Sequence, residues 1–424
     1  MKVSNRARIG TILAIVLVLI VPVQAFPMNL KQTNTLSSSE TDLIKTWTAL
    51  YYLDVDFNGA QNGDALELIF LDELASTDAL NVLVLQDKEK EPAFLYYIDE
   101  HHQKILLEEL GEVNMGDPQT IIDFISYAKE EYPAERYQFC PFGHASAWYG
   151  FCNDDTSGGD IVTMDEFKQA LTATGGIDLL CFIGCCQMGS LECVYELKDL
   201  CEVYVASESS GHQNDWIGTL DLMCNLLSDN HTLSTVECGE QIVQFICDNT
   251  NENYDTLTIS AIRTDKMAPL VTAFEQLCLY LRDDPDAVYE HLISARKQSK
   301  EYAFIQESCL IDVYDFVEKY REIETDENIV QILSNIQSNV SQALIAECHG
   351  DDQTGSHGLS IFYSSRDMIS AYAHYNLDFT KDTHWDDLLD MHKKESGTFS
   401  FEKIFHRFYE RFPALFLLLE SKWK

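Results

Sequence analysis

The sequence predicts an α/β fold in which a mainly parallel sheet is sandwiched by helices, with additional helices toward the C-terminus. Short apolar runs typical of buried strands alternate with segments of helical periodicity between residues 47 and 206. Past residue 265, helical periodicity dominates. The chain has 424 residues, which is enough to bury a large core. In such folds the functional site lies at the carboxyl ends of the strands.

The first elements form a predicted strand–helix–strand unit. Residues 47–53 (WTALYYL) and 81–85 (NVLVL) are short apolar runs typical of strands, and residues 65–74 between them have helical spacing. A further strand is predicted over 137–140. Thr163-x-x-Glu166 is a capping box, so a helix is predicted to begin there.

The next elements surround a pair of adjacent cysteines. Residues 177–184 (IDLLCFIG) are a continuous apolar run that ends in glycine, and a helix over 190–200 and a strand over 202–206 follow. Cys185 and Cys186 therefore lie in a strand-to-helix turn. Four later helices are predicted over residues 267–281, 286–300, 313–321 and 329–346, and a last strand over 358–363. The sequence shows no internal repeat and no clear domain boundary.

The charge of the chain restricts its partners. Asp and Glu number 69 against 29 Lys and Arg, a formal charge of −40, while 46% of residues are hydrophobic and 11% aromatic. This composition is typical of a folded acidic protein and not of a disordered tail. The negative field repels phosphates and anionic lipids, which argues against nucleic acid and membranes as main partners. Cationic peptides and divalent cations remain favoured.

The N-terminus has the pattern of a secretory signal peptide over residues 1–25. Lys2, Arg6 and Arg8 precede an apolar run over 9–21, and small residues lead to a cleavage site after position 25. The alternative is an uncleaved anchor, although a membrane span needs roughly 20 residues. The predicted location is therefore secreted or cell-surface associated, with no membrane contact beyond that anchor.

The chain has 13 cysteines, so at least one thiol is free if all the others pair. No CxxC pair recurs at the spacing of a zinc site. Five cysteines lie in apolar runs, where we expect small buried side chains and not disulfides or ligands: Cys181, Cys193, Cys224, Cys247 and Cys278.

Two turns hold the residues suited to catalysis. Phe142-Gly143-His144-Ala145 follows one predicted strand, and Cys186, in the second turn, lies 42 residues after His144. A thiol and an imidazole at neighbouring strand ends can act as nucleophile and base. The turn that opens a helix can supply N–H groups to an oxyanion, and the helix dipole favours a thiolate. From the residues alone, a structural histidine and buried or metal-binding cysteines remain the alternative.

The chain resembles the clostripain family of clan CD cysteine peptidases from Trp47 to about Trp385. The resemblance implies a caspase-like fold over residues 42–395 and a cysteine endopeptidase that cleaves peptide or protein substrates through a Cys–His dyad and a thioester. Segments that agree in order are WTALYYLDVDFN, NVLVLQD, GHASAW, DDTSGGDIVTMDEFKQAL, CQMGSLECVYEL, VASES and GLSIFY.

The resemblance also assigns catalytic residues. Cys186, followed by Gln-Met-Gly, corresponds to the nucleophile, and His144 corresponds to the base. The backbone N–H groups of Ala145 and Cys186 would form the oxyanion hole. Cys185 becomes the nucleophile if the strand is aligned without a gap.

The sequence departs from the family in two places. Residues 144–148 read His-Ala-Ser-Ala-Trp where relatives have His-Gly-Gly-Gly-Trp. The family's Asp two residues before the nucleophile, associated with Arg or Lys before the scissile bond, is Gly184 here. Residues 145–164 contain no Lys or Arg, so a basic-specific enzyme would not cut itself in that loop.

Five residues lie where the family builds its substrate pocket: Gly184, Ser207, Glu208, Asp215 and Trp216. A preference for basic residues would need Glu208 or Asp215 to receive the cation. Both acids are otherwise expected in solvated loops.

The predicted chemistry needs no cofactor or metal. The loop at Asp154–Asp155 is the alternative site for Ca2+, which some relatives bind, although it lacks EF-hand spacing. At the C-terminus, residues 396–424 are predicted to contain an amphipathic helix that packs on the domain or lies on a membrane surface. The sequence therefore predicts an exported cysteine endopeptidase. A catalytically inactive caspase-like protein that binds peptides or surface partners is the alternative.

Overall fold

The computed structural model describes residues 44–56, 73–210, 219–229, 232–249, 256–283, 285–304, 307–364, 369 and 372–396. Among the predicted features outside the described residues are the signal peptide over 1–25, most of the helix over 65–74, and the amphipathic segment beyond residue 396.

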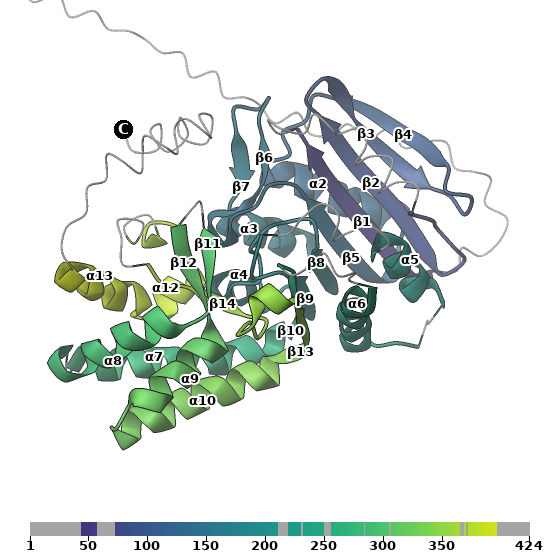
Figure 1. Ribbon diagram of the computed structural model, residues 1–424. Coiled ribbons are helices and arrows are strands. Elements are labelled where there is room, and N and C mark those ends of the chain that lie inside the picture. The colour runs from purple at the N-terminus through teal and green to yellow at the C-terminus, as the bar shows by residue number, and fades with distance from the viewer. Residues whose placement is uncertain are drawn as a thin grey trace, which may run out of the picture.

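A nine-stranded sheet forms the centre of the molecule (Figure 1), in the order β13-β10-β9-β8-β5-β1-β2-β3-β4. The five strands from β9 to β2 run parallel, and antiparallel strands extend the sheet at both sides. The predicted α/β class is confirmed. The strands are β1 Lys45–Val55, β2 Leu80–Lys88, β3 Glu91–Ile98, β4 Lys104–Gly111, β5 Ala134–Phe142, β8 Leu179–Phe182, β9 Val203–Ala206, β10 Thr258–Arg263 and β13 Leu344–His349.

Strand β1 lies between β2 and β5 and is buried from Trp47 to Val55. Its side chains alternate between the two faces of the sheet. Leu50 and Tyr52 join one hydrophobic cluster, and Ala49 and Tyr51 join the other. The strand therefore reads as one continuous apolar run because both of its faces are covered.

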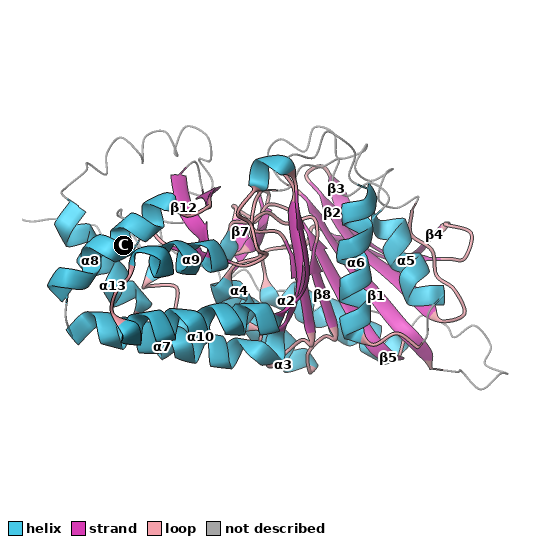
Figure 2. Cartoon of the chain, turned by 60° about the horizontal axis from the view of Figure 1, so that its bottom comes forward, coloured by secondary structure: helices cyan, strands magenta, loops and turns pink. Residues whose placement is uncertain are grey.

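Helices cover both faces. α2 (Pro118–Glu131) and α3 (Met164–Thr174) pack on one face, whereas α5 (Thr219–Asp229) and α6 (Thr235–Asn249) lie side by side on the other (Figure 2). The predicted capping box begins α3: the Thr163 side chain accepts the Glu166 N–H, and the Glu166 carboxylate accepts the Thr163 N–H.

The second half of the chain adds helices beside the large sheet (Figure 1). The four predicted helices are present as α7 Met267–Asp283, α8 Pro285–Gln298, α9 Val313–Ile323 and α10 Glu327–Ala343. A separate three-stranded sheet lies among them: β11 Glu301–Phe304, β12 Glu307–Asp312 and β14 Ser360–Phe362. Two further helices in the described ranges are α12 Asp378–Asp382 and α13 Trp385–Ser396.

One predicted helix boundary is wrong. The helix expected over 329–346 ends at Ala343, because the chain continues as β13 and pairs antiparallel with β10. The apolar residues of 344–346 satisfy helical spacing and strand pairing equally well, so only the partner strand decides between them. No helix in the described ranges has the length and apolarity to cross a bilayer.

The cysteines whose side chains the structure describes are ten free thiols and one disulfide-bonded pair. Cys181, Cys193, Cys224 and Cys278 are buried free thiols, as predicted. The prediction for Cys247 is wrong, because a disulfide joins Cys247 in α6 to Cys348 in β13. The bridge closes a loop with a sequence separation of 101 residues. It ties an outer helix to the last strand of the sheet.

Candidate active site

Sheet pairing brings the two predicted catalytic turns together. β5 and β8 are parallel neighbours, and beyond their last ladder positions Phe142 pairs with Gly184 in an isolated parallel bridge. His144 and Cys186 each lie two residues beyond this bridge. The two turns therefore leave the same edge of the sheet side by side.

The two adjacent cysteines differ in burial. Cys185 is 1% exposed and its Sγ lies 3.5 Å from the carbonyl oxygen of Pro141. Burial raises the pKa of the Cys185 thiol well above its usual range, and the neighbouring Cys186 adds to the shift. Cys186 is only half-buried. Of this pair, Cys186 is the more exposed residue.

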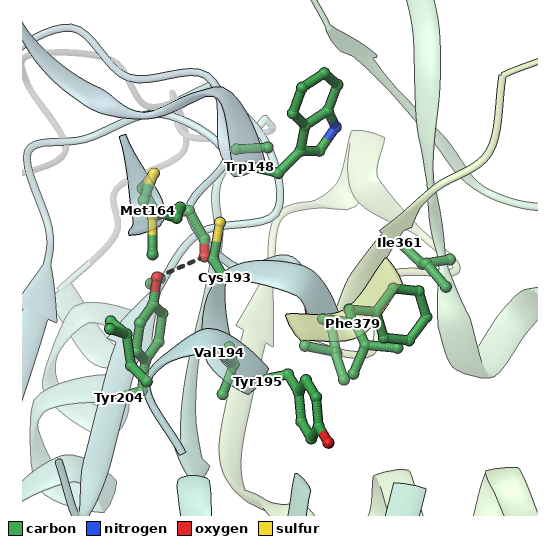
Figure 3. Close-up of a cluster of buried hydrophobic side chains, with 14 of the residues drawn as sticks. Trp148, Met164, Cys193, Val194, Tyr195, Tyr204, Ile361 and Phe379 are labelled. Carbon is green, nitrogen blue, oxygen red and sulfur yellow. Dashed lines mark hydrogen bonds between the residues drawn. The ribbon is translucent and has the colours of Figure 1, made fainter. Parts of the chain in front are cut away.

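Main-chain hydrogen bonds fix the cysteine turn to the next strand. The Gln187 N–H donates to Ser209 O at 3.0 Å, and the Gly189 N–H donates to Ser207 O at 2.8 Å. Gln187, directly after Cys186, has φ 63°, a conformation that costs a non-glycine residue energy and is typical of functional sites. The Tyr204 hydroxyl, in β9, also donates a hydrogen bond to the carbonyl oxygen of Met188 at 2.9 Å, which is drawn as a dashed line in Figure 3.

The helix after this turn is shorter than predicted. α4 spans Leu191–Glu196, with Ser190 as its N-cap, and does not reach residue 200. Cys186 therefore lies four residues before the N-cap. Because the helix dipole acts within the first turn, it does not account for a thiolate at Cys186. The expectation that the helix dipole favours a thiolate in this turn is therefore wrong.

His144 lies in the first turn of a small hairpin. Its carbonyl accepts the N–H of Cys152 at 2.9 Å, and the Ser146 N–H donates to Gly150 O at 3.0 Å. The side chain is exposed, yet protein on its inner side lowers the pKa of the imidazole by desolvation, and the Asp155 carboxylate opposes the shift. A lowered pKa keeps the ring neutral near pH 7, as a base requires.

The backbone geometry of Ala145 shows whether alanine can stand where relatives have glycine. Ala145 pairs with Phe151 in an antiparallel bridge whose hydrogen bonds come from the flanking residues, so its own N–H is directed away from that partner. Ala145 is also not among the residues with positive φ, whereas Ala147, at φ 46°, is. The backbone at position 145 therefore does not need glycine.

Gly184 has no room for a side chain. A Cβ built on Gly184 would lie 2.2 Å from Cδ2 of Phe142, so the aromatic ring fills the space into which a larger residue would project. Both residues line a small, mainly apolar cavity together with Leu53, Ile183 and Leu220.

The other predicted pocket residues have different surroundings. Ser207 is buried and its hydroxyl lies 2.8 Å from the hydroxyl of Thr258. Glu208 is 1% exposed and accepts the Gly358 N–H at 2.9 Å. Burial and the adjacent Asp312 raise the pKa of Glu208 well above its usual range. A buried, protonated carboxyl does not fit the expected role of cation acceptor.

Asp215 and Trp216, the last two predicted pocket residues, lie outside the described residues. For Asp215 and Trp216 the pocket assignment stays a prediction from the sequence.

The sequence did not predict one further cluster. Carboxylates of Asp56, Asp87, Glu112 and Asp154 converge near the hairpin of β6 (Phe151–Asp154) and β7 (Asp160–Val162), which directly follows the His144 turn. Burial, followed by the neighbouring acids, raises the pKa of Asp87 to about 9. Asp155, which was named with Asp154 as the alternative site for Ca2+, does not belong to this cluster. The signal in the sequence was an acid at or near the end of each of two adjacent strands, LDVD and LQD.

Comparison with known proteins agrees with this architecture. The clostripain family model (Peptidase_C11) matches residues 62–392. Clostripain of Hathewaya histolytica is 24% identical in an alignment that covers 86% of this chain and 84% of clostripain.

Solved structures share the fold. An inactive zymogen C11 protease from Parabacteroides distasonis superposes with a TM-score of 0.61 at 18% identity, covering 81% of this chain and 99% of that protein. A secreted C11 cysteine protease from Bacteroides thetaiotaomicron, solved with an irreversible peptide inhibitor, gives a TM-score of 0.59 at 16% identity with the same coverage.

Proposed function

Because this chain belongs to the clostripain family and is a cysteine-type endopeptidase, we propose that Cys186 is its nucleophile and His144 its base. The observation that carries the assignment is the pairing of Phe142 with Gly184, which places the two turns side by side at one sheet edge. The exposure of Cys186 and the burial of Cys185 support Cys186 over the alternative nucleophile.

The reaction follows from these side chains. The Cys186 Sγ attacks the carbonyl carbon of the scissile peptide, and His144 accepts the thiol proton. His144 then donates this proton to the leaving amine, which releases the first product and leaves a thioester on Cys186. Water hydrolyses the thioester, with His144 again taking and returning a proton. No third catalytic residue is assigned.

The oxyanion would be held by the backbone N–H groups of Ala145 and Cys186. A backbone donor needs the right direction and not a particular side chain. The N–H of Ala145 is directed away from its hairpin partner, and its φ is accessible to alanine. These two features support the use of Ala145 where relatives have glycine.

We propose that any selectivity for Arg or Lys before the scissile bond depends on Asp215. Glu208 is buried and its pKa is raised, so it offers no accessible negative charge. Gly184 carries no carboxylate, and the Phe142 ring occupies the adjacent space. Matched peptides with Arg, Lys, Leu or Asp before the scissile bond, tested on wild type and Asp215→Asn, check this. Arg selectivity that survives in Asp215→Asn would refute the role of Asp215, and equal cleavage of Arg and Leu peptides by wild type would refute a basic preference.

Export of the chain is also proposed. The apolar run over 9–21 behind three basic residues supports a signal peptide. The Cys247–Cys348 disulfide is typical of proteins that fold in an oxidising environment. N-terminal sequencing of the protein recovered from the culture medium should begin at residue 26. Recovery only inside cells with residue 1 intact would contradict export.

The central experiment measures peptide cleavage directly. The purified mature protein is incubated with a diverse peptide library, with and without a thiol alkylator, beside Cys186→Ala and His144→Ala. We expect cleavage that alkylation and both substitutions abolish. Absence of cleavage by the wild-type protein, together with retained peptide binding, would favour an inactive peptide-binding protein.

A further inference from the structure

Each catalytic turn is followed by a buried side chain that is not part of the dyad. Trp148 lies four residues after His144, in the short 3₁₀ helix Ala147–Tyr149, and Glu192 lies six residues after Cys186, in the first turn of α4. Both side chains are fully buried. The proposed reaction uses neither of them, yet each lies where a catalytic turn enters the protein interior.

The carboxylate of Glu192 binds two donors from distant segments. Its Oε1 accepts the main-chain N–H of Phe362, in β14, at 2.9 Å and the hydroxyl of Tyr372 at 3.0 Å. Burial raises the pKa of Glu192, and these two donors oppose the shift. Hydrogen bonds to a carboxylate are strong in a site that excludes water. Through this one oxygen, α4 is fastened to residues 170 and 180 positions later in the chain.

The same two residues hold Trp148. The rings of Phe362 and Tyr372 stack with their centroids 4.6 Å apart, and both are fully buried. Trp148 makes a T-shaped contact with each ring, at 5.3 Å and 5.2 Å between centroids. These are favourable distances and orientations for aromatic pairs. The Phe362–Tyr372 pair therefore contacts the histidine turn through its rings and the cysteine helix α4 through its hydrogen-bond donors.

The position of β14 is set by other parts of the chain as well. It pairs antiparallel with β12, and its first residue, Ser360, donates its N–H to the carbonyl oxygen of Gly189 at 2.9 Å. The carbonyl oxygen of Phe362 accepts the indole N–H of Trp385, at the start of α13, at 2.7 Å. The small sheet and α13 therefore hold Phe362 in place from the side opposite the catalytic turns.

We propose that Glu192, Phe362 and Tyr372 form a common anchor that sets the spacing between the two catalytic turns. Glu192 and Tyr372 are positioning residues in this anchor, because they act on the dyad through the segments that carry it. The inference rests on the proposed function of His144 and Cys186.

A second point of attachment matters for the geometry of the dyad. The Phe142–Gly184 bridge joins the turns where they leave the sheet, and a single joint leaves the turns able to rotate against each other. The common anchor adds a joint beyond the catalytic residues. Proton transfer between Cys186 and His144 needs their reacting atoms within about 3 Å, and a misplacement of about 1 Å can cost about 100-fold in rate.

The first experiment separates positioning from packing. Tyr372→Phe keeps the ring and removes the donor to Glu192. We expect kcat for a cleaved peptide to fall about tenfold, with KM within about twofold of wild type, at a temperature where the melting curve shows a folded variant. Tyr320→Phe is the matched control and should leave kcat unchanged, because the hydroxyl of this fully buried tyrosine has no hydrogen-bond partner in the described part of the chain. Equal kcat in the two variants would overturn the role of Tyr372.

Glu192 is tested by a conservative and a non-conservative variant. Glu192→Gln keeps an oxygen that accepts both donors and should retain kcat within about threefold of wild type. Glu192→Ala removes the acceptor and should lower kcat about 100-fold. An equal loss in both variants, or no loss in Glu192→Ala, would overturn the role assigned to Glu192.

A double-mutant cycle tests whether the two turns share the anchor. Trp148→Phe loosens the histidine turn and Glu192→Ala releases α4, so either change alone already disturbs the spacing. We expect the double variant to lose clearly less kcat than the product of the two single losses. Losses that multiply would mean that the turns are held independently, and would overturn the common anchor.

Failure of the anchor is distinguishable from failure of the proposed function. If wild type cleaves and both Tyr372→Phe and Glu192→Ala cleave equally well, the anchor is wrong and the proposed function stands. If wild type cleaves no peptide, the proposed function is wrong. The same cycle is then measured on the free energy of unfolding in urea, where coupling supports the shared anchor and additivity overturns it.

Discussion

The two adjacent cysteines give the most decisive test of the catalytic assignment. Cys186→Ala removes the proposed nucleophile and should lower kcat by about 10⁴-fold or more. Cys185→Ala removes one buried sulfur, 1% exposed, and should retain most of the activity. The loss of one buried atom should lower the free energy of unfolding by roughly 1–2 kcal/mol, because a small cavity remains.

The reactivity of the two thiols should also differ. A thiol of ordinary pKa near 8.5 is about 10% thiolate at pH 7.5. Burial raises the pKa of Cys185 well above its usual range, so a smaller fraction of it is thiolate, and the reagent also has little access to it. Cys186 should therefore react with iodoacetamide much faster than Cys185.

The assay follows both quantities together. Mass spectrometry of peptides from briefly alkylated protein gives the labelling of each cysteine, and peptide cleavage gives the residual activity of the same sample. Loss of activity should parallel the labelling of Cys186. A Cys185→Ala variant that folds, as judged by its melting curve, but does not cleave would refute the assignment of Cys186.

Three further predictions test the structure. Burial and Asp312 raise the pKa of Glu208, so the folded state holds a proton that the unfolded state releases, and stability is lost as pH rises above about 4.5. Glu208→Gln should thus have a higher Tm than wild type at pH 8 and a similar Tm near pH 4, whereas a lower Tm at pH 8 would contradict the protonated carboxyl. Cys348→Ser should lower the free energy of unfolding by roughly 2–4 kcal/mol in urea, and reduction of wild type should reproduce this loss. Gly184→Ala should cost roughly 1–3 kcal/mol and reduce cleavage, because its Cβ would meet the Phe142 ring; unchanged stability would mean that the ring moves freely.

Local sequence was sufficient for most of the fold. The apolar runs at 47–53 and 81–85 became adjacent parallel strands, and the capping box at Thr163 began a helix. These predictions succeed because strand burial and helix capping depend on side chains within a few residues of one another. The predicted end of the helix over 329–346 is wrong, because residues 344–346 form a strand only by pairing with β10, more than 80 residues earlier in the chain.

The sequence by itself determined that this chain is an acidic α/β protein with a histidine turn and a cysteine turn at strand ends, and its motifs were enough to identify the family. Only the tertiary structure decided which of Cys185 and Cys186 is the more exposed, and that Glu208 is buried beside Asp312. Only the tertiary structure brought Asp56, Asp87, Glu112 and Asp154 together. Burial and charge proximity arise from segments far apart in the chain, so no local pattern encodes them, whereas the order of strands, helices and turns is written in neighbouring residues.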